Sequence, residues 1–191
     1  MNKIYIQDKT FEKINFSESP MAKAEYENCS FINCVFLNAD LSYISFSECV
    51  FKASDLSLCK LNKTAFKEVK FKDCKLLGLL FEQCNEFLFG VDFENCQLNH
   101  SSFYKRNFKK TSFKNCQLIE VDFTEADLSN SFFDNCNLAG ATFENSILEK
   151  ADFRTSYHYI IHPQNNRVKK AKFSLSGMPG LLAAYDIEIS E

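Results

Sequence analysis

Residues 111–128 read TSFKNCQLIEVDFTEADL, and this stretch contains the pattern that decides the fold. A large apolar residue returns every five positions, at Phe113, Leu118, Phe123 and Leu128. A small or compact residue lies two positions before each of them, and the remaining positions are mostly polar. An amphipathic helix repeats its apolar face about every 3.6 residues and a strand about every 2, so neither element explains a period of five.

The same spacing covers most of the chain. It runs from Phe11 to Phe81, two extra residues then shift the phase, and it resumes from Leu88 to Phe153. All but Met21 and Tyr26 of these 29 positions are Phe or Leu. A chain that directs one large and one small residue inward every five residues must turn a corner each time, and four corners close a square coil of 20 residues. The sequence therefore predicts an all-β solenoid with a filled interior.

The columns of this solenoid follow from reading the sequence at a period of 20 residues, with the two-residue insertion allowed for. One column consists only of phenylalanine: Phe11, Phe31, Phe51, Phe71, Phe93, Phe113, Phe133, Phe153 and Phe173. Five of the nine cysteines share a column of small inward positions, namely Cys34, Cys74, Cys96, Cys116 and Cys136. A redox or metal-binding ladder is one interpretation of these thiols, but packing as small hydrophobic residues is favoured because no paired CxxC motif is present.

The composition excludes several classes of protein. With 46% hydrophobic and 25% charged residues among 191, the chain can bury a core. It contains only 5 Gly and no glycine-rich phosphate-binding motif, and its three histidines form no known catalytic arrangement. We therefore expect no enzymatic activity, cofactor or metal ion. No long apolar stretch or secretory signal is apparent, so a cytoplasmic protein without membrane contact is expected.

The insertion lies near residues 85–90 and adjoins the clearest exception to the inward pattern. Arg106 occupies a position where small residues belong. If the second phase already holds at Glu86, that residue lies one coil earlier in the same column, and the two side chains should form an ion pair because an unpaired buried charge is costly. The alternative is a bulged corner with Arg106 in solvent. Phe87 and Phe89 lie outside the columns and either mark a partner site or fold back onto the corner.

Charge is distributed unevenly along the chain, although the formal net charge is only -3. Residues 60–115 have a net charge of +5, and residues 116–153 have eight acidic side chains and one basic side chain. The acidic block should repel nucleic acid and attract a basic groove, although a solvated charged face is the default interpretation. Its acidic residues are Glu120, Asp122, Glu125, Asp127, Asp134, Glu144, Glu149 and Asp152.

Both ends of the solenoid need cover, because an open end exposes unpaired strands. Residues 1–10 contain Ile4-Tyr5-Ile6, which favours a strand over the first coil. Residues 11–155 form the repeat, and residues 156–191 are expected to be a cap or a dimer contact. Within this tail, residues 181–185 (LLAAY) predict a short helix after Gly177-Met178-Pro179-Gly180, and residues 187–189 (IEI) predict a strand.

The repeat resembles a known family. Ala39-Asp40-Leu41-Ser42, Ala126-Asp127-Leu128-Ser129 and Ala151-Asp152-Phe153 are similar to the A(D/N)LXX consensus of pentapeptide-repeat proteins. This resemblance covers roughly residues 11–155 and implies a right-handed quadrilateral parallel β-helix. The order of repeat, short helix with Leu-Leu, and final strand is similar to the C-terminus of the quinolone-resistance group, which includes the Qnr and MfpA proteins.

The second resemblance implies a function. Members of this group dimerise through the C-terminus into an acidic rod that resembles DNA and binds the type II topoisomerases DNA gyrase and topoisomerase IV. Carried over by position, the dimer contact would be formed by Leu181, Leu182, Tyr185, Ile187 and Ile189. Direct nucleic-acid binding is not expected from this resemblance. The chain departs from this group in two features, the basic block at 60–115 and an insertion shorter than the loops of Qnr proteins. The alternative function is a scaffold for another protein partner.

Overall fold

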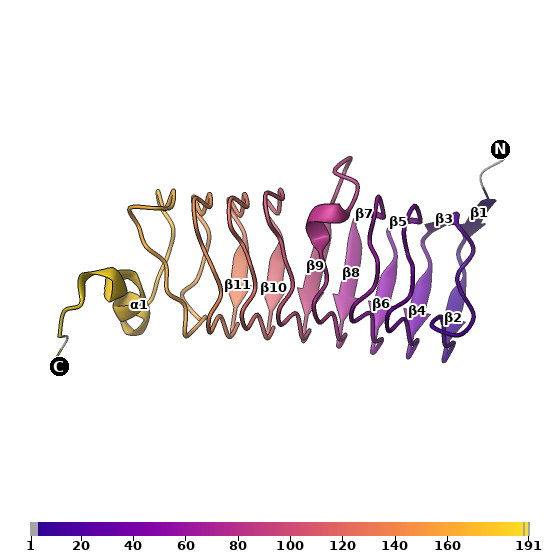
Figure 1. Cartoon of the computed structure of the whole chain (residues 1–191), viewed down its shortest axis with the longest axis horizontal. Coiled ribbons are helices and arrows are strands. Elements are labelled where there is room, and N and C mark those ends of the chain that lie inside the picture. Colours follow the sequence, from indigo (N-terminus) through magenta and orange to yellow (C-terminus); the bar gives the residue numbers. More distant parts are fainter. Residues whose placement is uncertain (1–3, 189, 191) are drawn as a thin grey trace.

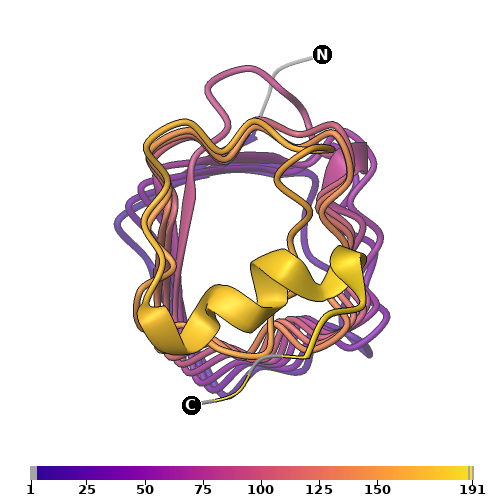
Figure 2. The same ribbon diagram turned by 90° about the vertical axis from the view of Figure 1, so that its left-hand side faces the viewer.

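The fold is a rod of stacked square coils (Figures 1 and 2). The structure is a computed structural model that describes residues 4–188 and residue 190. One parallel sheet has the order β1 (Ile4–Gln7), β3 (Ala24–Glu27), β5 (Ser45–Ser47) and β7 (Ala65–Lys67). A second parallel sheet has the order β2 (Thr10–Glu12), β4 (Ser30–Ile32), β6 (Val50–Lys52), β8 (Val69–Lys72), β9 (Val91–Glu94), β10 (Ser112–Lys114) and β11 (Phe132–Asp134). This architecture confirms the predicted quadrilateral β-helix.

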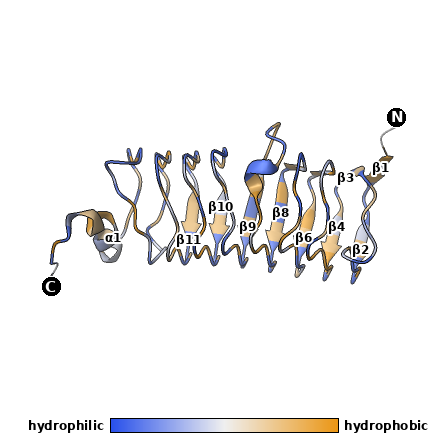
Figure 3. Cartoon of the chain, viewed as in Figure 1, coloured by the Kyte–Doolittle hydropathy of each residue, from blue (hydrophilic) through white to orange (hydrophobic). Residues whose placement is uncertain are grey.

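The register of the second sheet reproduces the period of the sequence. Phe11 pairs with Phe31, and Phe31 pairs with Phe51, so each strand lies 20 residues from the next. The exception is β8 with β9, where Phe71 pairs with Phe93 because the insertion adds two residues to that coil. In Figure 3, β6, β8, β10 and β11 contain hydrophobic residues, whereas β9 is largely hydrophilic in colour.

Stacked phenylalanine rings fill the interior. The nine rings from Phe11 to Phe173 form one continuous stack in which neighbouring centroids lie 4.6 to 5.4 Å apart. Adjacent parallel strands are about 4.7–4.9 Å apart, so the ring spacing is close to the spacing that the backbone hydrogen bonds impose. Stacked and edge-to-face aromatic pairs each add about 0.5–1.5 kcal/mol beyond their burial.

The corners need a left-handed backbone, and many of them are occupied by asparagine, the non-glycine residue that tolerates this conformation well. Asn95, Asn115 and Asn135 follow one another along one corner with φ of 55°, 53° and 52°. Their side-chain amides also connect the coils: Asn115 Nδ2 donates to Asn95 Oδ1 at 3.0 Å, and Asn135 Nδ2 donates to Asn115 Oδ1 at 2.9 Å. Asparagine at these positions therefore stabilises both the turn and the stacking.

The small inward side chains also bind the backbone. Cys116 Sγ donates to the carbonyl of Lys114 at 3.3 Å, and the hydroxyl of Ser146 donates to the carbonyl of Phe123 at 2.8 Å. All nine cysteines are buried and unpaired. Burial raises the pKa of the Cys49 and Cys59 thiols to about 12, which removes the thiolate needed for oxidation or metal binding.

The C-terminal end is covered by the tail. The 3₁₀ turn η2 (Leu175–Gly177), the helix α1 (Met178–Leu182) and the 3₁₀ turn η3 (Ala183–Tyr185) lie across the last coil (Figure 2). The amide of Ile161 donates to the carbonyl of Gly180 at 3.0 Å, and Leu181 is buried in the core. A Cβ at residue 180 would collide with the carbonyl of Tyr159, so glycine is required for this close approach.

Two predictions for the tail need correction. The α-helix begins at Met178 and not at Leu181, because Pro179 lies in its first turn, where the missing amide has no intrahelical partner to lose. The predicted strand at residues 187–189 is not formed at Ile187 or Glu188, and Ile189 lies outside the described residues. No helix in the described part of the chain is long and apolar enough to cross a membrane.

The buried thiols give a direct test of the interior. In the folded protein at mildly alkaline pH, the thiol reagent DTNB should label none of the nine cysteines, because their side chains are inaccessible. After denaturation in guanidinium chloride, all nine should react, and absorbance measures both numbers. Rapid labelling of any thiol in the folded protein would contradict the packing described above.

Candidate protein-docking surface: the insertion loop and the charged edges

The insertion forms a loop that projects from the rod (Figures 1 and 2). The amides of Asn85 and Gly90 donate to the carbonyls of Thr64 and Phe66 on the preceding coil, at 2.8 and 2.9 Å. Residues 86–89 lie between these two attachments, and we call them the insertion loop. Phe87 and Leu88 have 67% and 65% of their surface exposed, so the loop presents apolar side chains to solvent.

Phe89, and not Leu88, fills the inward position of this coil. The prediction that the inward pattern resumes at Leu88 is therefore wrong. Phe89 packs edge-on against Phe108, with ring centroids 5.1 Å apart, and more distantly against Phe66 at 6.5 Å. The two extra residues allow the backbone to bulge and place the next large apolar residue inward. Of the two aromatic residues on the insertion loop, Phe89 folds back onto the core and Phe87 remains exposed.

Arg106 is buried, with only 5% of its surface exposed, so the prediction that it might point to solvent is wrong. Its side chain takes the hydrogen-bonding role that hydroxyls have elsewhere in the column. Nε donates to the carbonyl of Phe81 at 3.0 Å, as the hydroxyl of Thr64 donates to the carbonyl of Leu41. Nη2 donates to the carbonyl of Cys84, the residue that occupies this column one coil earlier.

The predicted pair between Arg106 and Glu86 is present, but Glu86 is not in the column. Nη1 of Arg106 lies 2.9 Å from Oε1 of Glu86, which is 86% exposed on the insertion loop. The guanidinium carbon also lies 6.0 Å from the centroid of the Phe89 ring. A buried cation thus holds both ends of the loop to the core, and the loop is a fixed projection of the rod.

A groove of about 1050 Å³ lies beside the insertion loop on its N-terminal side. Its lining includes Lys60 and Lys63, the exposed ring of Tyr43, and Asn85 at the base of the loop. No group of three or more His, Cys, Asp or Glu residues in the described ranges, 4–188 and 190, is arranged to hold a metal ion.

Charge in the C-terminal half is separated across the width of the rod. Backbone bridges connect Asn107, Asp127, Ile147 and Arg167 in succession, so the segments that follow them stack on one another. We call residues 107–114, 127–134, 147–154 and 167–174 the basic edge, which has nine basic and four acidic side chains, a net charge of +5.

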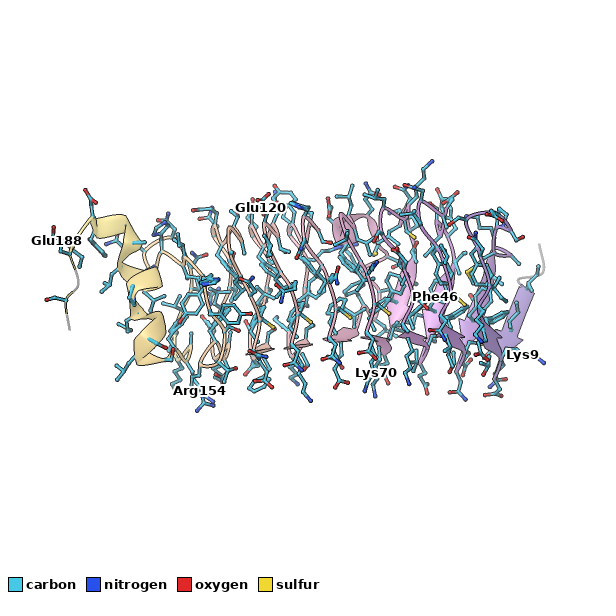
Figure 4. The ribbon with its side chains drawn as sticks, turned by 90° about the horizontal axis from the view of Figure 1, so that it is seen from below. Lys9, Phe46, Lys70, Glu120, Arg154 and Glu188 are labelled. Carbon is cyan, nitrogen blue, oxygen red and sulfur yellow. The ribbon has the colours of Figure 1, made fainter. Side chains whose placement is uncertain are left out.

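The other half of these coils has the opposite charge. We call residues 115–126 and 135–146 the acidic edge; it contains four carboxylates and no Lys or Arg, a net charge of -4. Bridges from Gln117 to Asn137 and from Asp122 to Thr142 place the two segments on neighbouring coils. Figure 4 shows Glu120 and Arg154 on opposite sides of the rod.

The eight acidic residues of block 116–153 are therefore divided between the two edges. Glu120, Asp122, Glu125 and Glu144 lie on the acidic edge, and Asp127, Asp134, Glu149 and Asp152 lie on the basic edge. Three of the latter are in ion pairs: Asp127 with Lys109 at 3.0 Å, Glu149 with Arg167 at 2.7 Å, and Asp152 with Arg154 at 2.8 Å. Hydrogen bonds from Arg154 hold the pKa of the Asp152 carboxyl below its usual range.

The acidic edge is less neutralised than the rest of the block. At its N-terminal boundary, Glu125 lies 3.4 Å from Lys105, and Glu120 lies 3.2 Å from Nδ1 of His100. Asp122 accepts a hydrogen bond from the amide of Thr124, and Glu144 accepts one from Asn165. Asp122 and Glu144 are half-buried, and neither has an ion pair within the described part of the chain.

The residues predicted for a dimer contact do not share one environment. Leu181 is buried within the chain and Leu182 is half-buried, whereas Tyr185 and Ile187 are exposed. Ile189 lies outside the described residues. The structure adds two exposed apolar residues that the sequence did not single out, Leu175 at 91% and Met178 at 39% exposed.

Substitutions of Arg106 and Glu86 should show which of the two side chains contributes more to the free energy of unfolding. Arg106→Ala should lower the free energy of unfolding by about 3 kcal/mol, because it leaves a cavity and leaves the carbonyl of Cys84 without a donor, while the carbonyl of Phe81 keeps only the amide of Cys84. Glu86→Ala should cost less than about 1 kcal/mol, because an exposed carboxylate gains little from an ion pair. Arg106→Ser should cost less than Arg106→Ala, since serine donates to the backbone at the equivalent Ser146.

Urea denaturation of the single and double variants measures these differences. In the Arg106→Ala background, Glu86→Ala should have no further effect. The same loss from Glu86→Ala in both backgrounds would contradict the ion pair as an anchor of the loop.

Comparison with known proteins identifies the repeat. The chain is similar in structure to QnrB1, a plasmid-mediated fluoroquinolone resistance protein, with 18% identity, a TM-score of 0.47 and 98% of each chain covered. It is also similar to HetL, a pentapeptide-repeat protein involved in heterocyst differentiation regulation from the cyanobacterium Nostoc sp. strain PCC 7120. That match has 14% identity, a TM-score of 0.46, and covers 88% of this chain and 86% of HetL.

A search of curated protein sequences finds no match. A family model described as a pentapeptide repeat region matches residues 24–86 and 87–157, which is more than half of the chain. The chain belongs to the pentapeptide-repeat family.

Proposed function

We propose that this chain is a non-enzymatic rod that binds a type II topoisomerase, DNA gyrase or topoisomerase IV, in the cytoplasm. The observation that carries the proposal is the acidic edge, which has four carboxylates and no Lys or Arg. Topoisomerases hold duplex DNA in basic grooves, and a rod with a negative edge complements such a groove. The order of elements, from acidic coils to C-terminal helix, also supports this assignment through the resemblance described above.

The charge density of the acidic edge is comparable with that of DNA. Four carboxylates lie on two coils, each about 4.8 Å deep, which gives about one carboxylate per 2.4 Å of rod axis. Glu125 is paired with Lys105, so about one negative charge per 3.2 Å remains without a Lys or Arg partner. Duplex DNA has one negative charge per about 1.7 Å of helix axis. DNA mimicry is therefore proposed for this edge alone, because the basic edge of the same coils has the opposite charge.

The insertion loop supplies a second type of contact. Phe87 and Leu88 are exposed apolar side chains on a projection that Arg106 anchors to the core. Exposed aromatic residues on a fixed element are typical of protein-binding surfaces, since little conformational entropy is lost on docking. We propose that the loop contacts the topoisomerase next to its DNA-binding groove.

The exposed apolar side chains of the cap favour a homodimer. Leu175, Met178, Tyr185 and Ile187 are exposed around α1, whereas Leu181 is buried in the chain itself and is unsuitable as a contact. A second copy related by a two-fold axis would cover this surface and double the length of the rod. The proposed dimer contact is therefore centred on Leu175 and Ile187.

Light scattering coupled to size-exclusion chromatography tests the dimer. The unmodified chain should elute as a dimer, and Leu175→Glu combined with Ile187→Glu should produce a monomer, because two carboxylates would be buried without partners. Tyr43→Glu combined with Leu58→Glu is the matched control, since both residues are exposed but lie far from the cap. A monomeric unmodified protein, or a variant that remains dimeric, would contradict this contact.

A supercoiling assay with and without a quinolone tests the proposed partner. The chain should inhibit supercoiling by gyrase or restore it in the presence of the drug. A variant with Glu120→Gln, Asp122→Asn, Glu125→Gln and Glu144→Gln should lose the effect, because it removes the negative charge of the acidic edge. The matched control replaces four exposed glutamates of the N-terminal half, Glu12, Glu18, Glu48 and Glu68, with glutamine.

The supercoiling assay tests separately whether a topoisomerase is the partner and whether the acidic edge is the surface that binds it. Equal loss in both variants would exclude the acidic edge as the docking surface. No effect of the unmodified chain on gyrase or on decatenation by topoisomerase IV would exclude these partners and leave the scaffold function, with another protein bound at the insertion loop.

A further inference from the structure

The basic edge contains more basic side chains than have an acidic partner. Five of its nine basic side chains have an acidic partner, namely Lys109, Lys114, Arg154, Arg167 and Lys172. Among the residues that the structure describes, the other four, Lys110, Lys150, Lys169 and Lys170, have no ion pair. All four are exposed.

The coils bring these four lysines together along one line. Lys110, Lys150 and Lys170 occupy the same left-handed corner on their respective coils, with φ of 63°, 59° and 60°. The amide of Lys150 donates to the carbonyl of Lys169 at 3.0 Å, so Lys169 and Lys170 lie on the coil next to Lys150. The corner is the most outward part of a coil, and cationic side chains there project away from the rod.

A row of uncompensated cations is unfavourable unless an anion binds it. Lys150 and Lys170 lie on neighbouring coils, about 4.8 Å apart, and like charges at this distance repel each other. Lys110 lies two coils from Lys150, with Asn130 at the corner between them. The acidic side chains on these coils do not relieve the repulsion. Asp127, Glu149 and Asp152 are held by other basic residues, and Glu120, Asp122, Glu125 and Glu144 lie on the acidic edge. Asp134 lies beside Lys114 in the sheet and accepts a hydrogen bond from Thr155, away from the corner that holds the lysines.

We propose that the basic edge binds the phosphate backbone of duplex DNA without sequence preference. The unpaired lysines follow one corner of the rod over four coils, with Asn130 between Lys110 and Lys150, and a row of cations along the rod axis suits a linear polyanion. A flat bilayer surface would touch such a corner along a narrow line. This proposal replaces the expectation that the chain does not bind nucleic acid, and it does not depend on the topoisomerase proposal.

Fluorescence anisotropy of a labelled duplex of random sequence provides the test. The duplex should bind with an affinity that falls with salt, with a slope of about -3.6 in a plot of log K against log salt if four lysines contact phosphates. Such a slope corresponds to a loss of about 150-fold between roughly 50 and 200 mM salt. Two duplexes of different sequence should bind with the same affinity.

Matched variants separate the edge from total charge. Lys→Gln at 110, 150, 169 and 170 should remove most of the binding, and each single Lys→Gln change should reduce the slope by about 1. The control makes the same change at Lys52, Lys60, Lys63 and Lys75, which are also exposed and unpaired in the part of the chain that the structure describes. Circular dichroism melting curves check that both variants remain folded.

Three results would overturn the proposal: no binding to the duplex, equal loss of binding in both variants, or retention on phosphatidylserine vesicles with no binding to DNA. The acidic-edge variant described above distinguishes this proposal from the proposed function. It should bind the duplex at least as tightly as the unmodified chain, whatever its effect on gyrase.

Discussion

The stack of nine phenylalanine rings is the interaction on which the rest of the rod depends. Parallel strands fix the height of a coil at about 4.8 Å, and flat rings fill that height with contacts close to their preferred separation. A large ring in each coil leaves room only for a small partner two residues earlier. Cysteine, serine, threonine and alanine fill most of these positions, and the thiols and hydroxyls donate to backbone carbonyls of the preceding coil, as Cys116 does to Phe93 and Ser146 to Phe123. The thiols are thus part of the packing.

Arg106 is an exception to the rule that small residues fill the inward positions, and its contacts explain why it is tolerated there. A guanidinium is tolerated at a small inward position because its nitrogens meet the carbonyls of Phe81 and Cys84 and the carboxylate of Glu86. Two extra residues are needed to bring that carboxylate within reach. The insertion and the buried cation therefore form one unit, which produces the projecting loop with Phe87 at its surface.

The interior is filled by side chains, so a partner can contact only the outer surface of the rod. On this surface, the coil period determines which charged residues lie next to one another. Residues that are separated by one coil in the sequence are neighbours in space, so a run of charges along the chain is divided among different sides. The acidic block of residues 116–153 separates in this way into an acidic edge and several compensated carboxylates on a basic edge. One rod can then present a protein-binding side and a polyanion-binding side.

Much of this could be predicted from the sequence, because every core position repeats the same rule. The columns and the buried thiols follow from the period of five. The pair of Arg106 with Glu86 is predicted on the premise that Glu86 lies in the column, and it forms although Glu86 lies on the exposed insertion loop. The position of the extra residues within 85–90 does not follow from the period, since the period alone cannot decide between Leu88 and Phe89 as the inward residue. The acidic and basic edges are also predictable, because charged residues grouped at a period of 20 residues separate into them, as the apolar residues separate into columns. The start of α1 at Met178 agrees with Pro179 in its first turn. The close approach of Gly180 to the carbonyl of Tyr159 is a tertiary contact that no local pattern reveals.

Zero-length carbodiimide cross-linking of the chain to purified DNA gyrase, followed by mass spectrometry, tests the central claim most directly. This reagent joins carboxylates to lysines that are in contact. The acidic edge should give the cross-links, through Glu120, Asp122, Glu125 and Glu144 to lysines in the DNA-binding groove of the enzyme. Cross-links that arise mainly from Asp134 and Asp152 on the basic edge, or none at all, would contradict it.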